Sequence, residues 1–184
     1  MRGLIALVLV IGAGLGWIVR SARIQREAVA AIEEDGGGAY YHWNWMKGSS
    51  NPGGEPWAPR WVVDLIGADY FGHVTAVWLS QNSVASDAVM EKAGRLTRIQ
   101  RLGLDRSSIS DTGLAHLKGL TELSDLSLSG TRVTDAGLAH LAGLTRLLRL
   151  DLERTRISGA GLAWIPTGKK TANGITGLPA CFSL

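Results

Sequence analysis

The sequence predicts a small α/β repeat protein, a solenoid of stacked units, with an apolar helical segment in front of it. The main observation is a repeat of 24 residues that runs three times without a break from Leu96. A run of apolar residues and glycines over residues 3–19 predicts the helix. The length of 184 residues suits one domain with appendages, and 46% apolar residues are not typical of a disordered chain.

The basic residues are concentrated around the apolar run. The formal net charge is +3, and four arginines flank the run: Arg2, Arg20, Arg23 and Arg26. The rest of the chain holds 15 basic and 16 acidic residues, so it is close to neutral. A neutral body does not predict a nucleic-acid-binding surface, and we expect no nucleic-acid partner.

Residues 3–19 are predicted to be a single-pass transmembrane anchor. These 17 residues form about 25 Å of helix, which is at the short limit for a bilayer span. Trp17 and the following Arg20 are typical of a membrane interface with a charged stop. The alternative is a cleaved signal peptide, for which Gly14 and Gly16 offer small residues before the cut. The arginines after the run favour a cytoplasmic position for the body.

Glycines in the same run predict a helix–helix contact. Gly12 and Gly16 form a small-xxx-small pair, which lets two helices approach closely and offers a route to self-association. The run also begins like a G-x-G-x-x-G nucleotide-binding turn. Trp17 stands where that turn needs its third glycine, so we expect no dinucleotide cofactor.

Residues 20–70 are predicted to be a juxtamembrane helix and an N-terminal cap for the solenoid. Apolar residues recur every three or four positions over 20–34, which predicts a helix that ends at Gly36. Alternating aromatic side chains over 39–45 predict a strand, and an apolar stripe over 59–68 predicts a second helix. We interpret the aromatic residues as core and not as a carbohydrate platform, because the end of a solenoid needs an apolar plug.

Three 24-residue units fill residues 96–167, and a degenerate unit over 71–95 precedes them at a 25-residue offset. Leucines recur at the same places in each full unit, for example at Leu102, Leu126 and Leu150. In the degenerate unit, the residues equivalent to Leu102, Leu104, Ile109 and Leu114 are Val77, Leu79, Val84 and Val89.

These units match the pattern L-x-x-L-x-L-x-x-N/C-x-L, and the chain therefore resembles the leucine-rich repeat family. It is most similar to the bacterial membrane-anchored members that are called internalin-like. The T-D-x-G-L-A-x-L signature also resembles repeats of F-box adaptors, although no F-box precedes the repeats. The resemblance implies a short strand around Leu102 and Leu104 on a concave face, a helix on the convex face, and scaffold-like protein recognition.

The polar positions of each unit have structural interpretations. Hydroxyl residues, which can bond neighbouring backbone groups, take the asparagine position of the family: Ser107, Thr131 and Thr155. The predicted helix N-caps are Ser110, Thr134 and Ser158. Asp111 and Asp135 add negative charge at the helix start, where the third unit has Gly159 instead.

The concave face is the predicted binding surface, because outward residues of adjacent units stack there in columns. Two columns alternate in charge: Arg101, Asp125, Arg149 and Arg98, Glu122, Arg146. Strands lie about 4.8 Å apart, so we expect these charges to neutralise each other in preference to recognising a ligand. A further column contains Trp78, Gly103, Ser127 and Asp151. The predicted binding residues are Trp78, Arg101, Asp125, Ser127, Arg149 and Asp151.

The residues do not predict an enzyme. His116 and His140 are one repeat apart, but no third ligand joins them, so we expect no metal site. No Ser/His/Asp or Cys/His arrangement has local support, and Cys181 has no activating neighbours. We therefore expect no catalytic residues and no cofactor.

The tail over residues 168–184 is irregular. The 24-residue period predicts leucines at 168, 171, 174 and 176, where the chain has glycine or threonine. The tail is either an irregular cap or the sign of a shortened member of a longer family.

These observations together predict a non-enzymatic protein–protein interaction module, a membrane-anchored leucine-rich repeat scaffold with a protein partner. The alternative is a structural component of the cell envelope without a specific ligand. A third interpretation is a shortened member of a longer family of leucine-rich repeat adaptors.

Overall fold

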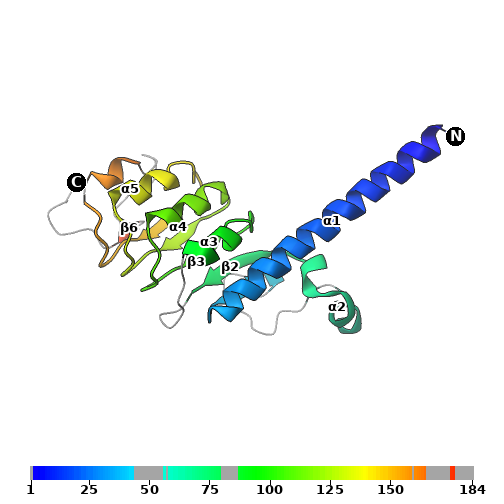
Figure 1. Ribbon diagram of the computed structural model, residues 1–184, viewed down its shortest axis with the longest axis horizontal. Helices are drawn as coiled ribbons and strands as arrows, with labels where there is room; N and C mark the ends of the chain where they lie inside the picture. Colours follow the sequence, from blue (N-terminus) through cyan, green and yellow to red (C-terminus); the bar gives the residue numbers. More distant parts are fainter. Residues whose placement is uncertain are drawn as a thin grey trace.

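The computed structural model describes residues 2–43, 56, 58–79, 87–158, 160–164 and 175–176. A long helix leads into a curved stack of short strands and helices (Figure 1). The strands are β1 (Gly38–Tyr41), β2 (Val74–Trp78), β3 (Arg101–Gly103), β4 (Asp125–Ser127), β5 (Arg149–Asp151) and β6 (Ile175–Thr176). The α-helices are α1 (Arg2–Glu34), α2 (Arg60–Ile66), α3 (Asp87–Ala93), α4 (Asp111–Ala115) and α5 (Asp135–Leu138). Short 3₁₀ helices are η2 (Ala68–Tyr70), η3 (His116–Gly119), η4 (Ala139–Leu141) and η5 (Gly161–Trp164).

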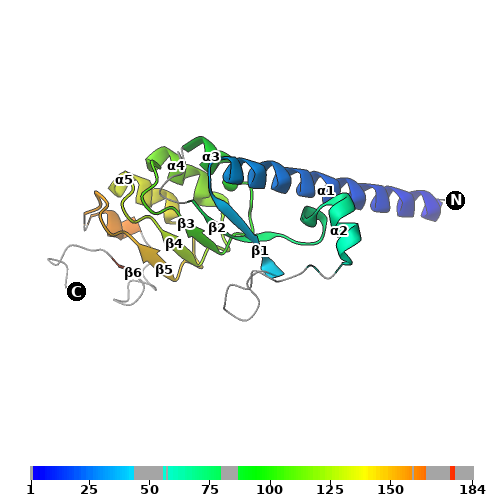
Figure 2. The ribbon, with the colours of Figure 1, turned by 90° about the horizontal axis from the view of Figure 1, so that it is seen from below.

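The strands form one sheet in chain order, from β1 to β6. β1 is antiparallel to β2, and every later pair is parallel. Leu126 pairs with Leu102 on one side and with Leu150 on the other, as the 24-residue spacing predicts. Figure 2 shows the strands along one side of the molecule and α3, α4 and α5 along the other.

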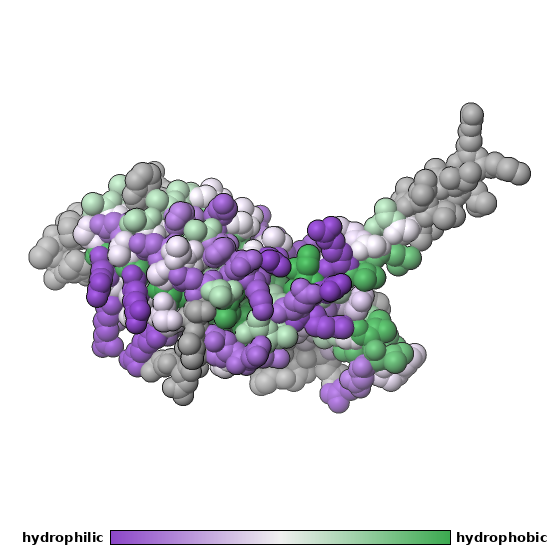
Figure 3. Space-filling model, in the orientation of Figure 1, coloured by the Kyte–Doolittle hydropathy of each residue, from purple (hydrophilic) through white to green (hydrophobic). Residues whose placement is uncertain are grey.

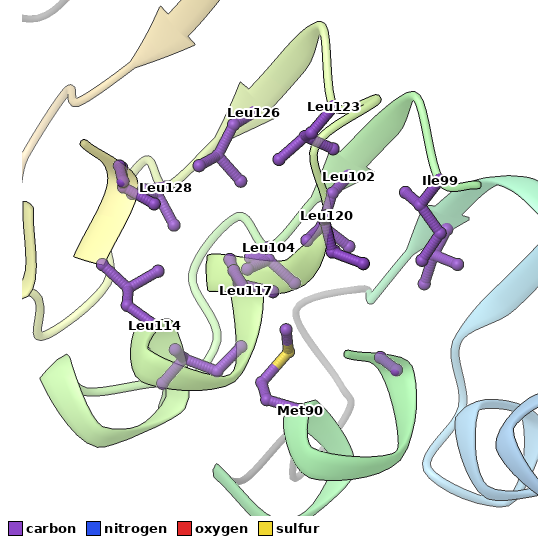
Figure 4. Close-up of a cluster of buried hydrophobic side chains, with 14 of the residues drawn as sticks. Met90, Ile99, Leu102, Leu104, Leu114, Leu117, Leu120, Leu123, Leu126 and Leu128 are labelled. Carbon is purple, nitrogen blue, oxygen red and sulfur yellow. The ribbon is translucent and has the colours of Figure 1, made fainter. Parts of the chain in front are cut away.

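The space between the sheet and the helices is filled by the repeated leucines. Leu102 and Leu104 point into it from β3 and the residue that follows, and Leu114 and Leu117 meet them from the helical side (Figure 4). All four side chains are at most 1% exposed. Each unit therefore buries its apolar side against the next unit, which is how a solenoid obtains a continuous core.

A carboxylate from each unit binds the helix N-cap of the next unit. Asp111 accepts two hydrogen bonds from Thr134, one from its backbone N–H at 2.8 Å and one from its hydroxyl at 2.7 Å. Two further pairs have the same bonds: Asp87 with Ser110, and Asp135 with Ser158. We call these contacts the aspartate staples. The N-caps are where the sequence predicts them, but the aspartates do more than place charge at a helix start.

The glycine of the T-D-x-G signature makes room for the staple. A Cβ placed on Gly137 would lie 2.3 Å from Asp111 Oδ1, closer than real Cβ contacts come. Gly113 stands in the same relation to Asp87, with a Cβ at 2.4 Å from Oδ1. The aspartate and the glycine of this signature are therefore parts of one contact between neighbouring units.

The hydroxyls at the asparagine position act within their own unit. Ser107 Oγ donates to the carbonyl of Leu104 at 2.7 Å, and Thr131 Oγ1 donates to Leu128 in the same way. Each hydroxyl thus closes the turn that follows its strand, three residues back along the chain.

The degenerate unit departs from its predicted alignment in its helical half. Asp87 begins α3 and bonds to the next unit as Asp111 does, so the offset there is 24 residues and not 25. Met90 is fully buried in the place of Leu114, while Val89 is only partly buried against the core. Val84 lies outside the described residues.

The C-terminal half of α1 closes the N-terminal end of the solenoid. Ala28 and Ile32 are at most 1% exposed in the core, and α1 contacts both α3 and β1. Gln25, which is buried, donates to the carbonyl of Gly72 at 3.1 Å and accepts from the Val74 N–H at 3.4 Å. The helix ends where the glycines predict, since Gly36 adopts a φ of 80°.

The prediction of a transmembrane anchor over residues 3–19 is wrong, and so is the single-pass membrane localisation with a cytoplasmic body. None of the helices in the described part of the chain has an apolar stretch long enough to cross a membrane. The run belongs to one continuous helix of 33 residues, the second half of which is charged on its outer side and packs on the solenoid.

The aromatic cap is only partly core. Trp43 is 6% exposed and stacks on Tyr41 with ring centroids 4.7 Å apart. The apolar stripe of α2 is instead exposed, with Trp61 at 69% and Leu65 at 75%. The interpretation as an apolar plug therefore holds for the residues beside β1 and not for α2.

Most of the predicted tail lies outside the described residues, but two of its residues form a strand. In β6, Ile175 pairs with Leu150 and Thr176 pairs with Asp151 in parallel register. The step from Leu150 to Ile175 is 25 residues, so the strict 24-residue period places this strand one residue too early.

The staples of Asp87 and Asp135 make stability depend on pH. Hydrogen bonds from Ser158 lower the pKa of Asp135. Burial raises the pKa of Asp87, but the hydrogen bonds from Ser110 and Thr112 outweigh burial, and the pKa of Asp87 is lowered. A lowered carboxyl pKa contributes stability that is present above the unfolded value of about 4 and lost as the pH falls through the folded value.

We expect the urea midpoint of unfolding to fall between pH 5 and pH 2. The midpoint should fall less in Asp87→Asn, because that variant has no carboxylate at position 87 to protonate. Asp64→Asn, a change on the exposed side of α2, should keep the full acid dependence. An Asp87→Asn variant with the same acid dependence as the natural sequence would show that the staple does not stabilise the folded state in this way.

Candidate functional site

The candidate site is the open face of the sheet, where the register aligns outward residues of neighbouring strands. Arg101 pairs with Asp125 and Asp125 with Arg149, which makes one column. The next column contains Trp78, Gly103, Ser127 and Asp151. The six predicted binding residues therefore lie in two adjacent columns of one surface.

Asp125 lies between two arginines. Its Oδ2 is 3.9 Å from Arg101 Nε, and its Oδ1 accepts a hydrogen bond from Arg149 Nε. Ser124 Oγ also donates to Oδ2, at 2.6 Å. Asp125 therefore contacts both arginines of this column. One carboxylate faces two guanidinium groups, however, so the column keeps an excess positive charge, and the Arg149 side chain is 68% exposed.

The second predicted charge column is arranged differently. Arg98 Nη1 lies 3.4 Å from Nδ1 of His73, which stacks on His42 with centroids 4.8 Å apart. Among the described residues, no ion pair joins Arg98, Glu122 and Arg146. Arg98 therefore lies against the histidine pair, and the column is not a ladder of ion pairs.

Trp78 lies flat over the glycine of the neighbouring strand. A Cβ on Gly103 would be 2.1 Å from Cε3 of the Trp78 ring, so the ring occupies the space that a side chain would take. Trp78 remains 40% exposed. Of the two arrangements that the glycine permits, a flat ring or an entering partner group, the structure has the flat ring.

The remaining two predicted residues are held by local hydrogen bonds. Ser127 Oγ donates to the Asp105 carboxylate, and Asp151 Oδ1 accepts from the Glu153 N–H at 3.0 Å. Both side chains are half-buried. They shape the surface next to Arg149 and leave the exposed ring of Trp78 and the arginine as its more accessible groups.

The described residues do not suggest a metal centre. No cluster of three or more His, Cys, Asp or Glu side chains with the geometry to hold an ion is found among them. His116 and His140 are both exposed on successive 3₁₀ helices, and Cys181 lies outside the described part. The arrangement on the concave face offers an exposed aromatic ring, charged side chains and hydroxyl groups for contact.

The parallel register, the inward leucines and the helices behind the sheet define a leucine-rich repeat solenoid. No protein-family model and no curated protein matches the chain. Among solved structures, an internalin (inlF) from Listeria monocytogenes is 22% identical, with a TM-score of 0.39, over 51% of this chain and 25% of that one. Internalin C2 from the same organism is 34% identical, with a TM-score of 0.35, over 41% of this chain and 32% of that one. The chain thus spans about a third or less of either internalin.

Proposed function

We propose that this protein is a non-enzymatic protein-interaction module that binds a partner on its concave face. The observation that supports this most directly is the exposed Trp78 ring in the column beside Arg101, Asp125 and Arg149. Tryptophan and arginine are the residue types most enriched among the positions that dominate binding energy at interfaces. The ring offers an apolar contact, and the exposed Arg149 side chain can pair with a carboxylate of the partner.

The size of the face limits its affinity. β2 has five residues, and β3, β4 and β5 have three each. At about 4.8 Å between strands the face measures on the order of 300 Å². A stable interface usually needs about 800 Å² from each partner. We therefore expect the single chain to bind with micromolar or weaker affinity, and tighter binding to need neighbouring loops or several copies.

The face can be located by photo-crosslinking. A photoreactive phenylalanine in place of Ser127 lies on the concave face, and the same residue in place of Lys118 lies on the exposed convex side. We expect a specific crosslinked partner from the Ser127 position and not from the Lys118 position. Equal crosslinking from both positions, or none from Ser127, would contradict a concave-face site and favour a structural role without a ligand.

Titration of the crosslinked partner against the full chain then tests the residues. Trp78→Ala should weaken binding at least tenfold, about the effect of losing one aromatic anchor. Asp125→Ala should also change affinity, because it removes the carboxylate that holds Arg101 and Arg149. Trp61→Ala, which removes an exposed tryptophan from α2, is the matched control and should have no effect. Nanomolar binding by one chain, or indifference to Trp78→Ala, would place the site elsewhere.

A further inference from the structure

A cleft of about 780 Å³ lies between α1 and the beginning of the solenoid. Residues of α1 between Trp17 and Gln25 form one wall, and segments 69–74 and 95–98 form the other. This volume is within the range of about 300–1,000 Å³ that is usual for ligand sites. The cleft includes none of the six concave-face residues, so it is a separate surface.

The α1 wall of the cleft carries large apolar side chains that the protein itself does not cover. Trp17 is 69% exposed and Ile18 is 42% exposed, and Tyr70 and Phe71 lie on the opposite side. Figure 3 shows green, hydrophobic side chains next to purple, hydrophilic ones where α1 leaves the body. An occupant with an aromatic or branched aliphatic side chain would remove this apolar surface from water.

The cleft is also basic. Arg20 comes from α1, and Arg95 and Arg98 come from the opposite wall. Arg95 contacts Glu91 at 2.9 Å, an exposed pair of the kind that contributes little and exchanges easily. Burial, His42 and Arg98 lower the pKa of His73, while the nearby Glu122 raises it. The lower pKa favours neutral His73, so the positive charge of the cleft comes from the guanidinium groups.

The one carboxylate that lines the cleft is already neutralised. Asp69 accepts a hydrogen bond from the Tyr41 hydroxyl at 2.7 Å and from Gln25 Nε2 at 3.3 Å. Arg26 Nε donates to its other oxygen at 3.2 Å, and the Asp69 side chain is only 8% exposed. The lining therefore presents three arginines to an occupant, and of these Arg95 also pairs with Glu91 outside the lining.

We propose that this cleft binds an acidic peptide segment that carries an aromatic or branched aliphatic side chain. The cations are distributed over both walls, which suits carboxylates spaced along a chain better than one compact anion. From Trp17 to Gln25 the wall is about 12 Å long, which is enough for about four residues of extended peptide. The apolar side chain would lie against Trp17, and the carboxylates would pair with the arginines at the rim.

Fluorescence anisotropy with the full 184-residue chain tests the proposal. The probe is a labelled hexapeptide in which glutamates flank a phenylalanine and a leucine, and the comparison peptide has glutamine at every glutamate. We expect binding of the acidic peptide that weakens with salt, and at least tenfold weaker binding of the glutamine peptide. Equal affinity for the two peptides would overturn the proposed role of the arginines.

Matched variants locate the site. Arg20→Glu and Arg98→Glu should each weaken binding at least tenfold, while Arg23→Glu, an 80% exposed arginine on the same helix outside the cleft, should change it less than twofold. Trp17→Ala should weaken binding, and Trp61→Ala, at the same 69% exposure on α2, should not. Circular dichroism should show that each variant is folded. An equal loss in Arg23→Glu would show unspecific attraction, and a loss in Trp78→Ala in place of Trp17→Ala would assign the peptide to the concave face; either result overturns the proposal.

Discussion

Leu126→Ala is expected to lower the free energy of unfolding by about 2–5 kcal/mol, the cost of a cavity in a well-packed core. Leu126 is 2% exposed and pairs with leucines of β3 and β5, so the lost side chain belongs to the contact between three units. The free energy of unfolding of a whole domain is only about 5–15 kcal/mol, so a loss of this size is a large part of the stability of a solenoid with so few units. Urea unfolding followed by circular dichroism measures the change.

Leu148→Ala is the matched control for this variant. Leu148 is 62% exposed two residues before Leu150, so the same atoms are removed from a surface position. Its unfolding midpoint should stay close to that of the natural sequence. A midpoint for Leu126→Ala that is no lower than that of Leu148→Ala would contradict the inward position of Leu126.

Asp111→Ala is expected to lower the free energy of unfolding by about 2 kcal/mol, because it removes the carboxylate that accepts two hydrogen bonds from Thr134. The loss also frees the Thr134 N–H, which is half-buried at the N-cap of α5, so water replaces the carboxylate only in part. Since the bonds join two units, the variant should weaken the coupling between them. Equilibrium unfolding in urea and amide hydrogen exchange at the Thr134 N–H measure the two effects.

Asp111→Asn and Asp64→Ala are the comparisons for this prediction. Asparagine keeps one acceptor oxygen for the Thr134 N–H, so Asp111→Asn should lose less stability than Asp111→Ala. Asp64 is exposed on α2, and Asp64→Ala should leave the unfolding midpoint unchanged. If Asp111→Ala were as stable as Asp64→Ala, the staple would be a contact without a net contribution to folding.

The register of the solenoid could be predicted because it follows from the order of residues along the chain. Each strand places alternate residues on opposite sides, and a period of 24 residues brings equivalent positions together. Leu102, Leu126 and Leu150 are therefore buried in line, and Arg101, Asp125 and Arg149 are outward in line. The contacts of Asp125 with Arg101 and Arg149 depend on this register.

The aspartate staples could not be predicted with the same reasoning. An aspartate after a serine or threonine at a helix start has a sufficient local explanation in the helix dipole, so the sequence does not point beyond its own unit. In the structure Asp111 binds Thr134 of the next unit, and this contact depends on how far one helix is displaced from the next. The glycine two residues later was the available signal, since a repeated glycine at a helix start implies a close approach.

By itself the sequence determined the repeat, its inward leucines and the columns of the concave face, because these depend only on spacing along the chain. The tertiary structure decided everything that depends on which surface another segment covers. It placed Met90 and not Val89 in the core, left Trp61 exposed, and showed that the run over residues 3–19 continues into a helix whose second half closes the solenoid. Hydrophobicity along a chain identifies segments that must avoid water, but only the packed structure shows which of them the protein covers itself.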